Sequence, residues 1–297
     1  MVTVAFAATT LASPAAARTN QIVLPNEEVG IFVSALNPAA PPPGVNNYSC
    51  VLTAAHPQPI VLIPGTFGNM TDDYGALAPV LVNDGYCVFA TNFGGTPGQL
   101  IQATGPMTTS AQQVATFIDQ VSAAYHGTQV DLIGHSQGAT LAEYAVKLLG
   151  EAPKVRNIVG LSPTTHGTTL SGLATLAGAI PGALTLVGTA CPACQDQVAG
   201  STVITALDRG PIAQPGVKYT IIETKNEEVV TPVGSTFIDE PGVVNEYVQS
   251  SCPADTVDHG DLSYDNTTIR LTLNALSPST AVAPTCLQTF PYPAVQQ

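Results

Sequence analysis

The chain has 297 residues, of which 8 are Lys or Arg and 21 are Asp or Glu, so its 10% of charged residues is far below the roughly 25% of an ordinary soluble domain. A net charge of −13 without any Lys/Arg cluster excludes binding to the phosphate backbone of nucleic acids and argues against adsorption to anionic membranes. Bounded runs of Val, Ile, Leu and Ala along the chain argue against disorder.

The first residues have the pattern of a targeting segment. Residues 2–11 form a short apolar run, and Ala15-Ala16-Ala17 has the small side chains of a signal-peptidase site. The basic stretch that begins a signal peptide is missing, so either the true start lies upstream or the segment is only an apolar tail. We expect residues 1–17 to be a signal-peptide remnant and the protein to be secreted and extracellular.

Residues 18–59 are rich in Pro, with Pro41-Pro42-Pro43-Gly44 as the clearest breaker, and we expect an irregular extension there. From residue 60 onward, apolar runs without strict alternation are separated by segments of helical periodicity, which is typical of parallel strands covered on both faces. These runs are residues 60–63, 86–90, 130–133, 157–161 and 219–222. The alternation predicts a single doubly wound α/β domain over residues 60–297.

One helix is predicted in more detail, between the second and third runs. Ser110 and Gln113 form a capping box at its start, and Gly127 ends it. Apolar side chains between them lie on one helical face, which indicates a helix packed against the sheet.

The six cysteines are an even number in a chain with extracellular features, which favours disulfides. Sequence proximity favours three pairs: Cys50 with Cys87, Cys191 with Cys194, and Cys252 with Cys286. The spacing Cys191-Pro-Ala-Cys194 also occurs in zinc and redox sites, but no second CxxC or His cluster completes a zinc site. The polar residues 195–197 predict no helix of the thioredoxin type, so we expect a local clip and no metal.

The motif Gly134-His135-Ser136-Gln137-Gly138 lies between a predicted strand and a predicted helix. In this context it is a nucleophile elbow, where the chain reverses so tightly that Ser136 takes a strained backbone and the glycines leave room for neighbouring chains. The following helix begins with free N–H groups and the positive end of its dipole, which stabilise an oxyanion. The string GxSxG alone is weak evidence, but its position makes Ser136 the predicted nucleophile.

A serine hydroxyl needs a base and an acid that orients the base, and in this fold they follow in the order serine, acid, histidine. His56 and His126 precede the serine. His135 lies inside the elbow with its side chain directed away from the reaction face, and His166 comes too early to leave an acid before it. His259 therefore remains as the predicted base, although by itself it would be an ordinary surface histidine.

The acid is expected in the loop after the run at residues 219–222. That loop carries Glu227 and Glu228, and the chemistry of the residues alone weighs the two equally. Asp255 and Asp258 are weaker candidates because they are too near the histidine in sequence to come from a separate loop.

The second oxyanion donor is expected in the loop after the first run, which contains Pro64-Gly65-Thr66. Gly65 lets the backbone pass close to the elbow, so the N–H of Thr66 can join the N–H of Gln137 on the oxyanion. Thr66 can add its hydroxyl. A Gly-rich turn after a strand is common, so this assignment is weak without further support.

Residues 157–195 contain no charged side chain. Within them, residues 170–190 are long and apolar enough for a membrane span, but their Gly and Pro residues make a poor one. A span would also put Ser136 and His259 on opposite sides of a bilayer. We expect an apolar, helical, lid-like segment at about residues 164–200 beside the active site, and an ordinary buried helical pair weighs equally.

Five segments together carry a resemblance: residues 59–69, 85–89, 134–138, 166–169 and 224–232. With them the chain from about residue 48 to residue 286 resembles the secreted bacterial triacylglycerol lipases of the lipase class 2 family, which are α/β hydrolases. The elbow is shared with many hydrolases, whereas the block at 224–232 and the cysteine placements are far more specific. The resemblance implies an α/β-hydrolase fold with a mostly parallel central sheet and helices on both faces, and the same three disulfides.

The chain departs from the family pattern in two places. Family members usually have His-Gly where Pro64-Gly65 stands, although a Pro-Gly-Thr turn serves the oxyanion in some fungal lipases. They usually carry Asp where this chain has Glu227, so the alignment selects Glu227 over Glu228. The longer side chain remains compatible with a Ser-His-Glu triad.

We therefore predict a secreted carboxylic ester hydrolase that cleaves acyl esters such as triacylglycerols through an acyl-enzyme. Ser136, His259 and Glu227 form the triad, and the N–H groups of Gln137 and Thr66 form the oxyanion hole. We expect a monomer that needs no cofactor, binds lipid-like esters and touches a lipid interface only transiently. The alternatives are a cutinase-like polyesterase or an extracellular acyltransferase with the same triad and, from another class, a catalytically silent secreted binding protein.

Overall fold

Six parallel strands form one sheet in the computed structural model, which describes residues 20–183 and 190–287. The strands are β1 (Ile60–Ile63), β2 (Val88–Ala90), β3 (Val130–His135), β4 (Val155–Leu161), β5 (Lys218–Glu223) and β6 (Val243–Tyr247). Their order across the sheet is β2-β1-β3-β4-β5-β6, and every neighbouring pair runs parallel. Because parallel strands share one carboxyl edge, the loops after β1, β3 and β5 meet there.

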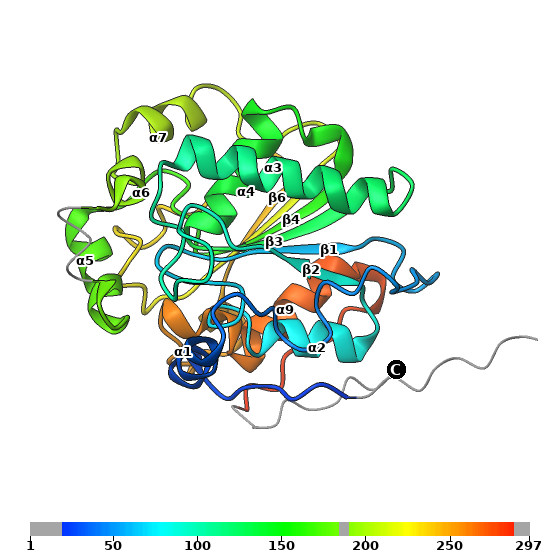
Figure 1. The fold of residues 1–297 in the computed structure, drawn as a ribbon. Helices are drawn as coiled ribbons and strands as arrows, with labels where there is room; N and C mark the ends of the chain where they lie inside the picture. Colours follow the sequence, from blue (N-terminus) through cyan, green and yellow to red (C-terminus); the bar gives the residue numbers. More distant parts are fainter. Residues whose placement is uncertain (1–19, 184–189, 288–297) are drawn as a thin grey trace, which may run out of the picture.

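Helices cover both faces of the sheet, as Figure 1 shows. The α-helices of the described residues are α1 (Glu27–Leu36), α2 (Leu77–Asp84), α3 (Met107–Ala124), α4 (Gln137–Leu148), α5 (Leu170–Ala179), α6 (Pro192–Asp196), α7 (Thr202–Leu207), α8 (Val248–Ser251) and α9 (Asn266–Leu276). Short 3₁₀ helices span Ala152–Lys154, Gly260–Ser263 and Pro278–Thr280. α3 and α4 lie against one face, and α2 and α9 lie against the other.

Alternate residues of each strand face two separate cores. Leu132 packs with α3 and α4, whereas its neighbour Ile133 packs with α2 and α9. All four residues of β1 are buried, so its Ile and Val side chains fill both faces. This arrangement confirms the predicted doubly wound α/β fold.

The N-terminal extension is more ordered than the sequence predicts. α1 begins where the Asn26 side chain accepts the N–H of Val29 at 3.1 Å. The N–H of Glu27 donates to Asp261 at 2.8 Å and so fastens this helix to the C-terminal part of the chain. The prediction of an irregular segment is wrong for α1, because the Asn cap and the acidic first turn outweigh the Pro content around it. The signal-peptide remnant expected at residues 1–17 lies outside the described residues.

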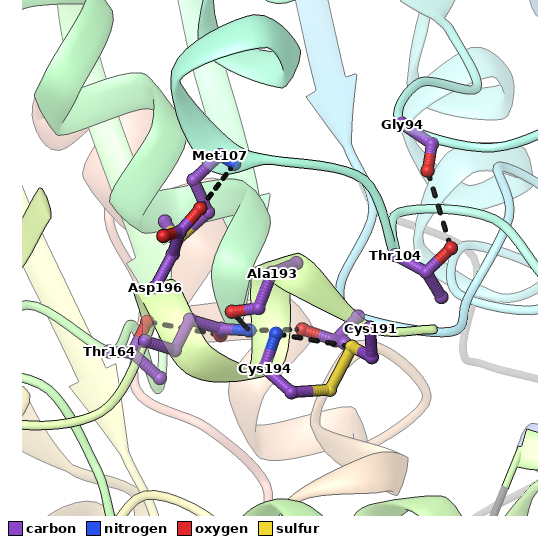
Figure 2. The surroundings of a disulfide bond; sticks show 10 residues. Gly94, Thr104, Met107, Thr164, Cys191, Ala193, Cys194 and Asp196 are labelled. Carbon is purple, nitrogen blue, oxygen red and sulfur yellow. Dashed lines mark hydrogen bonds between the residues drawn. A yellow bond between two sulfur atoms is a disulfide. The ribbon is translucent and has the colours of Figure 1, made fainter. Parts of the chain in front are cut away.

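Three further local features of the structure were predicted differently or not at all. α3 begins at Met107, whose N–H donates to Asp196 at 2.8 Å (Figure 2), so Ser110 lies inside the helix and forms no capping box. The short helix α6 begins at Pro192, within the Cys191–Cys194 pair, where no helix of the thioredoxin type was predicted. β6 escaped prediction because it is a partly exposed edge strand in which Asn and Glu interrupt the apolar pattern.

All six cysteines are paired, and the three pairs are those favoured by sequence proximity: Cys50–Cys87, Cys191–Cys194 and Cys252–Cys286. The first and third bonds close segments of 37 and 34 residues. On a chain-entropy account, each of these two bonds stabilises the fold by about 3 to 4 kcal/mol.

Candidate active site

Ser136 lies at the junction of β3 and α4, at the carboxyl edge of the sheet. Its φ of 51° and ψ of −125° fall in a region that non-glycine residues rarely adopt, so its backbone is strained. The close approach of β1 requires glycine at position 138, because a Cβ there would lie 2.0 Å from the carbonyl oxygen of Ile63. The local structure is that of a strand-to-helix elbow.

The Ser136 hydroxyl is buried and makes no hydrogen bond to the other described residues. The residue is 1% exposed, and its Oγ has no hydrogen-bond partner in the part of the chain that the structure describes. Gln137 is the first residue of α4, where N–H groups have no intrahelical acceptor and the helix dipole is positive. Burying a polar atom without a partner costs free energy, so such an atom marks a site built for something other than stability.

The structure brings Glu227 and His259 together. His259 Nδ1 lies 2.8 Å from Glu227 Oε2, and both side chains are fully buried. The other carboxylate oxygen of Glu227 accepts the N–H groups of Val229 at 2.7 Å and Val230 at 2.8 Å. His259 Nε2 has no partner among the described residues. With Nδ1 donating to the carboxylate, Nε2 is the nitrogen that is able to accept a proton.

The surroundings separate the two candidate acids. Burial opposes the charge on Glu227, but the charge and hydrogen bond of His259, followed by two backbone N–H groups, lower the pKa of Glu227 below its usual value. The pKa of Glu228 is raised, chiefly by burial and then by the negative charge of Glu227. Glu227 is therefore the carboxylate that is held ionised against the histidine.

His135 connects the serine to the loop of His259. The two histidine rings lie 4.8 Å apart between centroids, and His135 Nε2 lies 3.0 Å from the carbonyl oxygen of His259. Ser136 follows His135 directly in the chain. The Ser136 hydroxyl and His259 Nε2 are not hydrogen-bonded to each other, and both are buried in segments that this contact fastens together.

Thr66 lies in the loop after β1, next to the elbow. A Cβ added to Gly65 would lie 3.2 Å from the Cβ of Ser136, so this loop passes directly beside the serine. The side chain of Thr66 is buried, and its Oγ1 accepts a hydrogen bond from Gln197 Nε2 at 2.8 Å. Because the amide donates, the Thr66 hydroxyl keeps its own proton for another acceptor.

Gln197 directly follows the short helix α6, whose first turn is bridged by a disulfide. Figure 2 shows the bond between Cys191 and Cys194 around the first turn of α6. The Gln197 amide also donates to the carbonyl of Ala193 at 3.1 Å, and its oxygen accepts from Thr164 at 3.2 Å. No sequence motif marks Gln197, and its contact with Thr66 spans 131 positions, so its place beside the site escaped prediction.

The predicted lid-like segment is described only in part, since residues 184–189 lie outside the described residues. Leu173 and Ala177 of α5 are buried in the main core, so the described part of the segment packs as an ordinary helix does. Among residues 20–183 and 190–287, no helix combines the length and apolarity needed to cross a membrane. In the described part of the uncharged stretch, Leu176 and Ile180 are also buried in the main core.

Comparison with protein families identifies the chain's relatives. The model of the family Lipase (class 2) matches residues 57–272, which include Ser136, Glu227 and His259. No curated protein sequence matches the chain significantly.

Solved structures share the fold at low sequence identity. Lipase B from Aspergillus fumigatus matches with a TM-score of 0.61 and 20% identity over 82% of this chain and 60% of that one. The mature form of the Bacillus licheniformis lipase BlEst2 matches with a TM-score of 0.50 and 17% identity over 82% of this chain and 97% of that one. This chain thus spans about three fifths of the A. fumigatus protein (60%), and at these identities the likeness shows the α/β-hydrolase fold alone.

Proposed function

The chain belongs to the lipase class 2 family, and from this premise we propose that it is a secreted serine ester hydrolase that cleaves lipid-like acyl esters, triacylglycerols among them. The observation that carries the proposal is the strained Ser136 in an elbow next to the loop of a buried Glu227–His259 hydrogen bond. Among the described residues, the Ser136 hydroxyl has no hydrogen-bond partner. Family membership supports lipolytic ester hydrolysis; the triad, the triacylglycerol substrate and secretion are our proposals.

In the acylation step, Ser136 Oγ attacks the ester carbonyl carbon and gives its proton to His259 Nε2. A new Oγ–C bond forms, and the electron pair of the carbonyl double bond moves to its oxygen. Glu227 holds the imidazole by Nδ1 and stabilises the imidazolium that forms, since its carboxylate stays ionised. When the tetrahedral intermediate collapses, the ester C–O bond breaks, and His259 gives the proton to the departing alcohol.

In the deacylation step, water repeats the attack on the acyl-enzyme. His259 Nε2 takes a proton from water, the hydroxide oxygen bonds to the acyl carbon, and the Ser136 Oγ–C bond breaks with return of the proton to Oγ. In both steps the oxyanion accepts hydrogen bonds from the N–H groups of Gln137 and Thr66. Removal of one such donor typically slows an enzyme by about 100 to 1,000-fold.

We assign substrate entry to the uncharged stretch of residues 157–195, of which residues 164–200 act as the lid-like segment. An acyl chain is apolar, so a path without charges avoids the cost of desolvating ionised side chains. The supporting observation is the contact between Gln197, two residues after the uncharged stretch and inside the lid-like segment, and Thr66 in the proposed oxyanion hole.

An activated phosphonate tests the proposal, because it reacts only with an activated nucleophile. We expect stoichiometric labelling of the wild-type protein, with the adduct on Ser136, and neither labelling nor p-nitrophenyl ester turnover for Ser136→Ala. An adduct mapped to another residue would overturn the assignment. An ester chain-length profile of the wild type, with emulsified triglyceride and polyester film beside soluble esters, then separates a lipase from a polyesterase.

A further inference from the structure

A buried Asp–His pair lies next to the elbow and takes part in no chemical step of the proposed reaction. Asp73 comes from the segment between β1 and α2, and His135 is the last residue of β3. Asp73 Oδ1 lies 2.6 Å from His135 Nδ1, and the two side chains are 6% and 5% exposed. An ionisable pair so little exposed is costly to desolvate and is kept only where its hydrogen bonds are satisfied.

Both ring nitrogens of His135 face oxygen atoms that only accept hydrogen bonds. Nδ1 faces the Asp73 carboxylate, and Nε2 lies 3.0 Å from the carbonyl oxygen of His259. A neutral imidazole has one N–H, so it satisfies only one of these two contacts. The contacts are complete only when His135 carries a proton on each nitrogen.

The second carboxylate oxygen of Asp73 makes the next link. It accepts the N–H of Gly65, the residue before Thr66. The main-chain carbonyl of Asp73 also accepts the hydroxyl of Ser263, which lies in the 3₁₀ helix after His259. One side-chain pair and its backbone therefore join the loop after β1, the elbow and the His259 loop.

We propose that the Asp73–His135 pair is the positioning element that sets the serine, the histidine loop and the oxyanion loop in register. This positioning role rests on the proposed function, and neither Asp73 nor His135 touches a reacting atom. His135 acts through the His259 backbone, and Asp73 acts through His135 and Gly65. A displacement of about 1 Å between such groups lowers the rate roughly 100-fold, so a rigid link of this kind has a measurable effect on kcat.

The charges around the pair favour the doubly protonated ring. Burial lowers the pKa of His135, but the charge and hydrogen bond of Asp73, together with the charge of Glu27, raise it to about 9. The pKa of Glu27 is itself raised to about 7, by burial and then by the negative charge of Asp73.

Other titratable groups face this cluster from the elements packed on it. Asp73, Asp258 and Asp261 place negative charge near Glu27, and Asp72 and Asp73 lie near Tyr264. Burial raises the pKa of Asp72 well above its usual value. The His259 ring lies tilted against the His135 ring, at 4.8 Å between centroids. Among these groups, Asp73 and then Glu27 raise the pKa of His135, so the charge that compensates its imidazolium comes chiefly from Asp73.

Substitutions at Asp73 separate the charge of the pair from its hydrogen bonds. In Asp73→Asn the amide oxygen is able to accept the Gly65 N–H, and the amide nitrogen is able to donate to a neutral His135, whose Nε2–H still reaches His259. We expect kcat to fall about 3- to 10-fold. Asp73→Ala removes both links, and we expect a fall of about 100-fold, with KM within about 2-fold of wild type in both variants.

The chain offers a matched control in the exposed pair of His166 and Asp208, whose Nδ1–Oδ1 distance is also 2.6 Å. Asp208→Asn is expected to leave kcat unchanged. Near-UV circular dichroism identifies folded variants, and Asp73→Asn decides the matter if Asp73→Ala does not fold. The proposal would be overturned if folded Asp73→Ala had the kcat of the wild type. If Asp73→Ala does not fold, a wild-type kcat in folded Asp73→Asn would overturn it.

Histidine ¹⁵N NMR measures the protonation of the His135 ring nitrogens without any substrate. We expect both ring nitrogens of His135 to be protonated in the wild type from about pH 6 to about pH 8, and Nδ1 to become an acceptor in Asp73→Asn. A single ring proton in the wild type would overturn the proposal. If Ser136→Ala loses all turnover and Asp73→Ala keeps it, only the positioning role is rejected. If Ser136→Ala keeps its turnover, the proposed function is rejected.

Discussion

Two histidines of this chain make the same pair of hydrogen bonds in opposite surroundings. His135 lies 2.6 Å from the Asp73 carboxylate and 3.0 Å from a backbone carbonyl oxygen. His166 lies 2.6 Å from the Asp208 carboxylate and 3.1 Å from a backbone carbonyl oxygen. The side chains of the first pair are 5% and 6% exposed, and those of the second are 40% and 39% exposed. The hydrogen-bond geometry is shared, so a difference in the effects of the two pairs comes from their exposure to water and from the segments that each pair joins.

Water replaces the lost partner at the exposed pair and has no access to the buried one. Surface ion pairs contribute about 0 to 1 kcal/mol, because solvent screens the charges and the side chains lose rotamer freedom. Breaking a buried pair leaves one charged group without a partner in a medium that solvates it poorly. Burial and the segments joined, more than hydrogen-bond geometry, therefore decide what an Asp–His pair does.

The largest effect is expected at a third carboxylate–histidine pair, Glu227 with His259, which is fully buried. Glu227→Gln keeps the shape of the side chain but removes the charge that fixes the histidine tautomer, so we expect kcat to fall by about 10,000-fold. The matched substitution Asp208→Asn at the exposed pair is expected to leave ester turnover unchanged. Initial rates with a soluble p-nitrophenyl ester measure both.

Glu228→Gln is the control for this experiment, since it alters the adjacent carboxyl by the same chemical change. We expect it to keep activity within about 3-fold of wild type, because the carboxylate that lies against His259 Nδ1 is that of Glu227. If Glu228→Gln loses more activity than Glu227→Gln, the assignment of the acid is wrong.

The next effect is on stability. Asp73→Ala leaves the buried imidazolium without its counter-ion, and we expect the free energy of unfolding to drop by about 3 to 5 kcal/mol. Asp208→Ala acts on the exposed pair, and we expect a drop of about 0 to 1 kcal/mol. Urea unfolding followed by fluorescence or circular dichroism compares the two variants. Equal losses would mean that burial does not distinguish the pairs.

The buried pair also predicts a pH dependence of stability. The pKa of His135 is raised to about 9, so the stabilisation that it provides is complete below about pH 6.5 and is lost as the pH rises through 9. The corresponding free energy is about 3 kcal/mol. Unfolding curves from pH 6 to pH 10 are expected to fall more steeply for the wild type than for Asp73→Asn, and parallel curves would contradict this cause.

The smallest effect concerns salt. Asp208→Asn is expected to cost about 0.5 kcal/mol at low ionic strength and almost nothing in about 1 M NaCl, where the Debye length is about 3 Å. The cost of Asp73→Asn is expected to change little with salt, because ions do not reach a buried pair. Urea titrations at two salt concentrations measure this, and a buried pair as salt-sensitive as the exposed one would remove the distinction.

The parts of the fold that the sequence predicts are those encoded in short segments. Apolar runs of Val and Ile predict β1 and β3, because their side chains are buried on both faces of the sheet. The elbow motif predicts the conformation of Ser136, since the strand, the tight turn and the helix lie within a few residues. The local disulfides follow similarly from short separations in the chain.

The parts that escaped prediction depend on contacts between distant segments. Asp73 and His135 are 62 positions apart, and no motif marks either as a partner of the other. The contact that fastens α1, from Glu27 to Asp261, spans 234 positions. Such pairings are fixed by the topology of the sheet, which brings the loops after β1 and β3 to one edge and is not encoded in any single segment.

The three disulfides lie so that none of them bridges the segment between β4 and α5. Each bond lies wholly before β4 or wholly after α5, so one cut between these two elements would leave no covalent link between the resulting fragments. The serine would stay on the N-terminal fragment, and Glu227 and His259 would stay on the C-terminal one. The two fragments meet along the β4–β5 pairing, from Asn157 opposite Lys218 to Leu161 opposite Ile222. A cut at this place would therefore divide the proposed triad between two fragments that only non-covalent contacts hold together.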